Sequence, residues 1–174
     1  EELMLALGEE KGRELALNYD RAFPAAYREA FSPKIAVQDI IQLEKLTSKN
    51  DLEVNIYRPQ DTPEQIICFK LYHQETTVPL SDAIPILEKM GLRVIGEQPY
   101  QIISQDGCSN WINDFNMHYT REAERHLEKI GQIFQDAFSA IWHIKAEHDG
   151  FNALILGAQL PWREVALLRA YAKY

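Results

Sequence analysis

Apolar residues recur every three or four positions over residues 1–50, which is the spacing of amphipathic helices. Pro24 interrupts this pattern. Ser32 with Pro33 then opens a later helix, because serine is a good N-cap and proline suits the first helical position. The apolar positions that can cluster on the first helix face are Leu3, Leu7, Leu15 and Tyr19. The first fifty residues therefore predict a helical layer.

The period of the apolar pattern changes to two after Asp51. Residues 52–57 alternate apolar with polar side chains, which is typical of a strand with one buried face. Residues 67–72 alternate again after a loop that contains two prolines. Two strands joined by a short connection predict an antiparallel pair.

A helix is predicted between Pro79 and Gly91. Ser81 or Asp82 can cap its N-terminus, and Pro85 fits the first turn if Asp82 is the cap. Glycine at the other end suits the left-handed residue that often follows a helix. The buried stripe of this helix is expected to be Ile84, Leu87 and Met90.

The following residues predict two more strands and a long helix. Residues 92–96 form the third strand, with a continuation after Pro99. The Asp-Gly pair at 106–107 is a strong hairpin-turn signal, so residues 111–119 form the fourth strand. Thr120 can cap the long helix, whose apolar stripe comprises Leu127, Ile130, Phe134, Ala137, Phe138 and Ile141.

The end of the chain predicts a short helix over residues 151–157 and a closing helix that starts at Pro161. The residues of the closing helix that are expected to face inward are Val165, Leu168 and Ala172.

The elements between residues 51 and 145 follow the order strand-strand-helix-strand-strand-helix. Two helices can cover one face of a four-stranded antiparallel sheet, which predicts an α+β fold. Moving the first strand to the end gives strand-helix-strand-strand-helix-strand, which is the ferredoxin-like order. This predicts a ferredoxin-like fold with a permuted strand order. We therefore expect an N-terminal helical segment over 1–50, an α+β domain over 51–145 and a C-terminal helical segment over 146–174.

Composition changes this picture little. The 174 residues, of which 46% are hydrophobic and 25% charged, are ordinary for a globular chain of one domain. The formal net charge of −8 argues against nucleic-acid and anionic-membrane partners, which need clustered Lys and Arg. The longest apolar run is shorter than the roughly 18–20 residues that cross a bilayer. Cys68 and Cys108 predict buried free thiols rather than a disulfide framework.

Four polar residues gather near the end of the predicted long helix: His143, Glu147, His148 and Asp149. His143 and Glu147 would share a helix face, which allows a metal site. We favour a solvated helix C-terminus, where the helix dipole favours histidine. The eight glycines contain no G-x-G-x-x-G spacing. The sequence therefore predicts no catalytic residue, no nicotinamide site and no metal site.

Three stretches carry more specific information. They read ALNYDRAFPAAYREAFSPKIAVQDI at 16–40, PLSDAIPILEKMGLRVIGEQPY at 79–100 and DGFNALILGAQLPWREVALLRAYAKY at 149–174. Together they resemble the segment that precedes the catalytic core of the large NAD-specific glutamate dehydrogenases of bacteria. The most specific matches are LSDAIPILEKMGLRVIGE and WREVALLRAYAKY, since neither is a generic helix or turn pattern.

The resemblance implies that residues 51–145 form an ACT-like module and that the catalytic domain of the same chain begins soon after Tyr174. The parent would be a cytoplasmic homo-oligomer that converts L-glutamate to 2-oxoglutarate with NAD. This segment itself would be regulatory or scaffolding, without catalytic activity or cofactor. ACT modules bind effectors near such a turn, so Leu80, Ser81 and Asp82 are candidate contacts for an amino-acid effector, with plain helix capping as the alternative.

Two other functions stay open: a stand-alone interaction or effector-binding module, and a small metal-dependent enzyme that uses residues 143–149. The chain starts at Glu1 inside a predicted helix and without an initiator methionine, so we expect a piece of a longer polypeptide. The large aromatic residues near the end are either core or a contact surface for the catalytic domain or a second subunit: Trp142, Trp162, Tyr171 and Tyr174.

Overall fold

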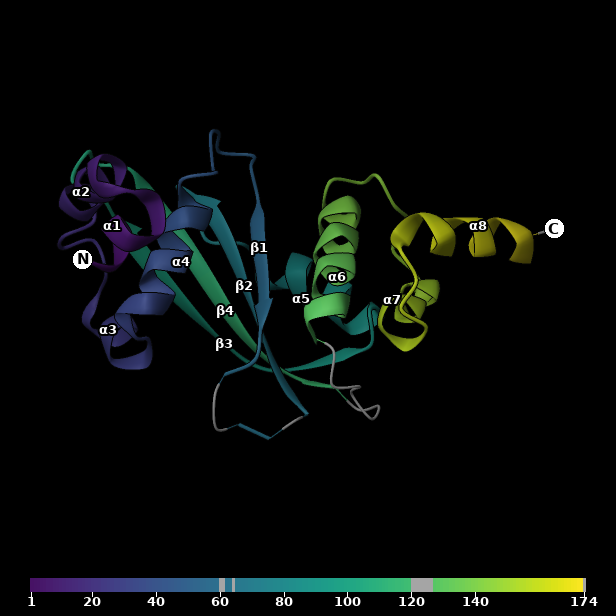
Figure 1. Ribbon diagram of the computed structural model, residues 1–174. Coiled ribbons are helices and arrows are strands. Elements are labelled where there is room, and N and C mark those ends of the chain that lie inside the picture. Colours follow the sequence, from purple (N-terminus) through teal and green to yellow (C-terminus); the bar gives the residue numbers. More distant parts are fainter. Residues whose placement is uncertain (60–61, 64, 120–126, 174) are drawn as a thin grey trace. The chain divides into compact units, whose positions relative to one another are not determined.

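The computed structural model describes residues 1–59, 62–63, 65–119 and 127–173 (Figure 1). The predicted cap at Thr120 and the aromatic residue Tyr174 lie outside the described residues, as does the side chain of Leu127. None of the helices in the described part of the chain is both long and apolar enough to cross a membrane.

Four strands form one antiparallel sheet in the spatial order β1-β2-β4-β3. Their bounds are Glu53–Tyr57 for β1, Ile66–Gln74 for β2, Leu92–Ile103 for β3 and Ser109–Tyr119 for β4. The two central strands pair antiparallel, because the Tyr119 N–H donates to the Gln65 carbonyl at 2.9 Å and the Glu75 N–H donates to the Ser109 carbonyl at 2.7 Å. The predicted α+β class with a four-stranded antiparallel sheet is confirmed.

The third strand runs through Pro99 without a break. This is possible because β3 lies at an edge of the sheet, where a missing N–H need not interrupt the ladder. The turn between β3 and β4 contains Gly107 with φ +85°, which confirms the predicted hairpin turn.

The chain divides into two compact units. The first comprises residues 1–53, 71–77 and 98–113, and the second comprises residues 54–70, 78–97 and 114–174. All four strands therefore contribute residues to both units, although β1 contributes only Glu53 to the first. The boundaries proposed from the sequence, at residues 50 and 145, stay predictions.

The first unit contains four helices: α1 (Glu2–Leu7), α2 (Glu9–Asn18), α3 (Ala25–Ala30) and α4 (Pro33–Leu43). The predicted N-terminal cluster is confirmed, since Leu3, Leu15 and Tyr19 are buried and Leu7 packs against them. A Cβ on Gly12 would lie 2.5 Å from the Met4 Cα, so glycine is required where α2 passes α1.

The core of the first unit also contains a buried polar cluster. The Asp39 carboxylate of α4 accepts hydrogen bonds from the Tyr27 hydroxyl of α3 and, at 2.7 Å, from the Tyr72 hydroxyl of β2. All three side chains are almost fully buried. A buried carboxylate needs such donors, so the cluster fixes α3, α4 and β2 to one another.

In the second unit, helices α5 (Leu80–Lys89) and α6 (Leu127–Trp142) lie side by side over the sheet (Figure 1). Phe69 of β2 meets α6 edge-on, with its ring centroid 5.3 Å from Phe134 and 4.8 Å from Phe138. The described residues of the predicted stripe on α6 are all buried: Ile130, Phe134, Ala137, Phe138 and Ile141.

The second unit closes with the short helix η1 (Gly150–Asn152), α7 (Ala153–Gly157) and α8 (Trp162–Ala172). The inward face predicted for α8 is partly wrong. Val165 is buried, but Leu168 and Ala172 are exposed, and Arg169 is buried in their place. Arg169 lies four residues after Val165 and therefore on the same helix face.

Candidate functional site

The candidate effector residues lie at the start of α5. Leu80 is the first residue of this helix, and Leu80, Ser81 and Asp82 are all exposed. The predicted cap is wrong: Pro79 is the N-cap, and its carbonyl accepts from the Asp82 N–H at 3.0 Å. The Ser81 hydroxyl donates to the Asp82 carboxylate at 3.2 Å. Pro85 consequently lies inside the helix, one turn later than expected.

This arrangement places a carboxylate at the helix start that would repel an anionic ligand. Effector binding at these three residues stays a prediction. Calorimetric titration of the common amino acids tests it directly, because heat from any one of them that vanishes in an Asp82→Arg or Ser81→Trp variant would locate the site here.

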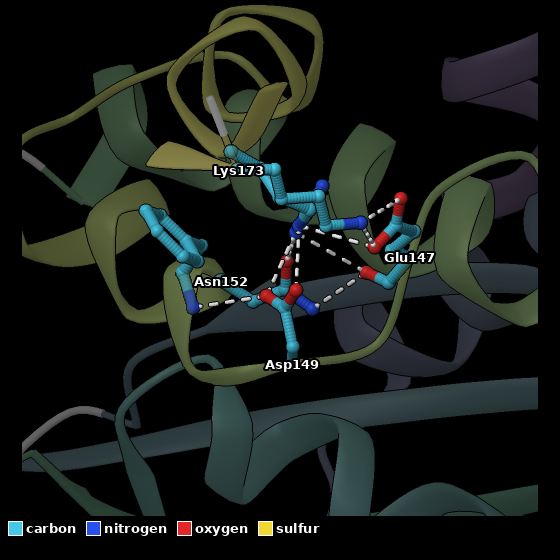
Figure 2. Close-up of polar contacts among 6 residues, drawn as sticks. Glu147, Asp149, Asn152 and Lys173 are labelled. Carbon is cyan, nitrogen blue, oxygen red and sulfur yellow. Dashed lines mark hydrogen bonds and ion pairs between the residues drawn. The ribbon is translucent and has the colours of Figure 1, made fainter. Parts of the chain in front are cut away.

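A second polar site lies in the C-terminal part of the second unit, and the sequence did not predict it. Figure 2 shows the polar contacts of this site, in which Lys173 faces Glu147. Arg169 of α8 supplies the central charge of this cluster, and its side chain is only 4% exposed. An arginine inside the apolar run of α8 was the signal that could have indicated a buried ion pair.

The guanidinium of Arg169 binds the Asp149 carboxylate with two hydrogen bonds. Its Nε donates to Oδ2 at 2.6 Å and its Nη2 donates to Oδ1 at 2.9 Å. The Nη2 also donates to the Asn152 Oδ1 at 2.9 Å, and the guanidinium lies 5.8 Å from the Phe151 ring centroid. A bidentate pair of this kind fixes both distance and orientation. We call these residues, together with Glu147 and Lys173, the Arg169 clamp.

The remaining members of the clamp tie α8 to the preceding turn. The Asp149 carboxylate accepts from the Phe151 N–H at 3.0 Å, which caps η1. The Lys173 Nζ donates to both Glu147 oxygens at 3.1 and 3.2 Å. The hydrogen bonds from Arg169 hold the pKa of Asp149 below its ordinary value, so the carboxylate is ionised at neutral pH.

The polar residues at the end of α6 do not form one site. Helix α6 ends at Trp142, so the prediction that His143 and Glu147 share a helix face is wrong. The His148 Nε2 is 3.0 Å from the Pro85 carbonyl oxygen, and Asp149 binds Arg169. Throughout the residues that the structure describes, no group of three His, Cys, Asp or Glu side chains is placed to hold a metal ion.

The cysteine prediction is only partly confirmed. Both cysteines are free, but only Cys68 is buried, whereas Cys108 is half-buried beside the turn that precedes β4. Cys108 was expected to be buried, and that part is wrong.

The sheet carries a further buried polar cluster in the second unit. The Tyr57 hydroxyl donates to the Asp114 carboxylate at 2.9 Å, and the Lys70 Nζ lies 5.3 Å from the Tyr57 ring centroid. The Cys68 thiol donates to the Asn116 side chain at 3.0 Å. Burial raises the pKa of Cys68 to about 11, so this thiol is not a nucleophile at neutral pH. The cluster is structural.

The described connection from β2 to α5 lacks the features of a nicotinamide site. Dinucleotide sites use a glycine-rich turn between a strand and a helix, where the backbone approaches the pyrophosphate. The connection from β2 to α5, residues 75–79, reads Glu-Thr-Thr-Val-Pro and has no glycine. This connection therefore does not provide the turn that approaches a pyrophosphate in dinucleotide sites.

A four-stranded antiparallel sheet with two helices over one face defines an ACT-like α+β module, here combined with helical segments. Three family models cover most of the chain. They are described as the glutamate dehydrogenase helical motif 2 (residues 2–46), the glutamate dehydrogenase ACT3 domain (residues 51–130) and the glutamate dehydrogenase helical motif 3 (residues 146–174). The chain belongs to the large NAD-specific glutamate dehydrogenase family and corresponds to a segment of such an enzyme.

Curated relatives agree with this assignment. The chain is 46% identical over 168 residues to an NAD-specific glutamate dehydrogenase of Pseudomonas aeruginosa, which covers 97% of the chain. It is 43% identical to that of Halomonas elongata over 96% of the chain, and 36% identical to that of Mycobacterium tuberculosis over 94%. The chain spans 10% of the length of each relative.

Proposed function

We propose that this segment is a non-catalytic scaffold of an NAD-specific glutamate dehydrogenase. The parent would be a homo-oligomer that converts L-glutamate to 2-oxoglutarate with NAD in another domain of the same polypeptide. The segment would present a rigid surface to that domain and keep it in an active arrangement. The relatives' names and the three family models support the parent activity.

The observation that carries the scaffold role is the exposed apolar side of α8. Val165 of this helix is buried in the second unit, so one side of α8 is covered. On other sides Leu167 is 61% exposed and Tyr171 is 79% exposed, and Leu168 is exposed as well. A helix that is apolar around most of its circumference is normally buried on all sides. Its second partner is therefore expected in the nine-tenths of the parent that this chain does not contain.

The Arg169 clamp supports the same role. It fixes α8 against the turn at residues 147–152 through a buried bidentate ion pair. A helix held in this way presents its exposed side chains in one orientation, so docking costs little conformational entropy. We infer that the clamp keeps α8 ready for its partner.

The test uses the full-length protein that carries this segment. Leu167→Glu with Tyr171→Glu places two charges on the exposed side of α8 and leaves the clamp intact. We expect at least a tenfold loss of NAD-dependent glutamate oxidation, or dissociation of the oligomer in light scattering. The matched control, Leu5→Glu with Leu17→Glu, changes two side chains of the first unit that are 78% and 63% exposed, and it should behave as wild type.

Wild-type activity and mass for the α8 pair would refute the scaffold role of α8, and so would an equal loss in the control pair. The non-catalytic part of the proposal has its own test. The 174-residue chain alone should not oxidise glutamate with NAD, and measurable turnover by it would overturn this part.

A further inference from the structure

Helix α6 ends in a conformation that normally uses glycine. The Lys145 N–H donates to the Ala140 carbonyl at 2.7 Å, and the Ile144 N–H donates to the Ile141 carbonyl at 3.0 Å. This pair of bonds is the Schellman motif, whose residue after the C-cap is left-handed and is most often glycine. Ile144 occupies that position with φ +58°. A β-branched side chain is among the least favourable choices there.

Burial within the described structure does not compensate for this strain, because Ile144 is 92% exposed. An apolar side chain that is both strained and solvated weakens the segment by itself. Strained residues persist where the surrounding structure or a function holds them in place. Both features of Ile144 are explained if a partner buries this side chain.

A groove beside Ile144 begins at Lys145, and its lining indicates the chemistry of the partner. Its volume is about 410 Å³, and it lies between the residues after α6 and one side of α8. Small side chains give it an apolar floor, namely Ala146, Ala166 and Ala170, and its charged lining residues are Lys145, Arg169, Lys173 and Glu147. Arg169 pairs with Asp149 and Lys173 pairs with Glu147, so Lys145 gives the described groove a net positive charge in a chain of net charge −8. It therefore favours an acidic partner.

The remaining polypeptide of the parent can supply the segment that fills this groove, because the relatives are about ten times as long as this chain. We propose that Ile144 and the adjoining groove dock a segment of the remaining polypeptide that carries carboxylates around an apolar pocket or side chain. This inference rests on the proposed scaffold function and names a second contact for it, separate from Leu167 and Tyr171.

Ile144→Gly tests the inference because it should stabilise the 174-residue chain but destabilise the full-length enzyme. In the 174-residue chain it relieves the strain, so the thermal midpoint rises by about 2–4 °C. In the full-length enzyme it removes the contact, so heat inactivation becomes at least threefold faster or glutamate oxidation falls. The control is Gln159→Gly, because Gln159 is also exposed and has φ +55°. This control should not impair the full-length enzyme.

The charge of the groove is tested by Lys145→Glu in the full-length enzyme. We expect faster heat inactivation than in wild type, and a smaller difference between the two in high salt because salt screens the contact. Lys89→Glu on α5 is the matched control, since Lys89 is exposed and lies outside the groove.

Three results would overturn the docking site. One is an Ile144→Gly enzyme that is as stable and active as wild type. Another is a Lys145→Glu enzyme that matches its control. The third is concentration-dependent dimerisation of the 174-residue chain that Ile144→Gly abolishes, because the occupant is then a second copy. If Leu167→Glu with Tyr171→Glu still inactivates the enzyme, the scaffold function stands while the docking site fails.

Discussion

Arg169 joins α8 to the turn that precedes η1 through its ion pair with Asp149. Replacing it by methionine keeps most of the volume but leaves the Asp149 carboxylate without its two strongest donors. Removing one partner of a buried ion pair costs about 3–5 kcal/mol, and we expect the lower end because Asp149 is partly exposed. Arg169→Lys keeps the charge but loses the bidentate geometry, so it should fall between wild type and methionine. Urea unfolding of the 174-residue chain measures all three.

Arg13→Met is the matched control for this prediction. Arg13 pairs with Glu9 on the surface of α2 at 3.0 Å, and both side chains are mostly solvated. Such surface pairs contribute about 0.3–0.5 kcal/mol. If Arg169→Met costs no more than Arg13→Met, the clamp does not stabilise the chain and its role in orienting α8 must be abandoned.

Asp51 gives a pH dependence with a definite sign. The hydroxyl and N–H of Thr47 and the N–H of Ser48 donate to its carboxylate, which lowers the pKa of Asp51 from 3.8 to about 2. A folded-state pKa below the unfolded value stabilises the chain above pH 4, and this stabilisation is lost as the pH falls from about 4 to 2. Thr47→Val should therefore raise the pKa of Asp51 in a carboxyl-carbon NMR titration. An unchanged midpoint would contradict this account.

At the scale of elements, the Asp39 cluster determines how α3, α4 and β2 stay together. Tyr72→Phe removes a hydroxyl that donates to Asp39 at 2.7 Å and leaves the ring in place. A hydrogen bond to a buried charged group contributes about 1.5–3 kcal/mol, so a loss in this range is expected in urea unfolding. Tyr171→Phe, at an exposed position of α8, should change stability by less than about 0.5 kcal/mol. Equal effects at the two tyrosines would contradict the role of the cluster.

Helices and strands could be predicted from the sequence wherever the apolar residues follow a single period. The stripe on α6 repeats at three and four, and residues 114–119 of β4 alternate polar with apolar side chains, so both were found. Element ends were less predictable. Pro79 is the N-cap of α5 and provides no side-chain acceptor, whereas the sequence rule looks for a side-chain oxygen such as that of Ser81. An arginine in an apolar run can indicate a buried ion pair, but it does not identify the partner of Arg169, which lies 20 residues away.

At the scale of the whole molecule, the sequence predicted the α+β class but not the division into compact units. Periodicity is a local property, whereas the units combine stretches far apart in the chain, such as residues 1–53 with 98–113. The same limit applies to the site. The sequence placed His143 and Glu147 on one helix, whereas helix α6 ends at Trp142 in the structure.

All four strands have residues in both compact units, and this predicts that the units unfold together. Ile112 and Phe115 of β4 lie in different units, but one continuous strand carries both. Opening either unit must break hydrogen bonds of that strand with β2 and β3, so the amides of both residues should exchange with solvent only through a shared opening. Tyr72→Phe, which acts in the first unit, should then speed the exchange of both amides by the same factor. Acceleration of Ile112 alone would mean that the units open independently, in which case a disturbance of the first unit would not reach α8 through the sheet.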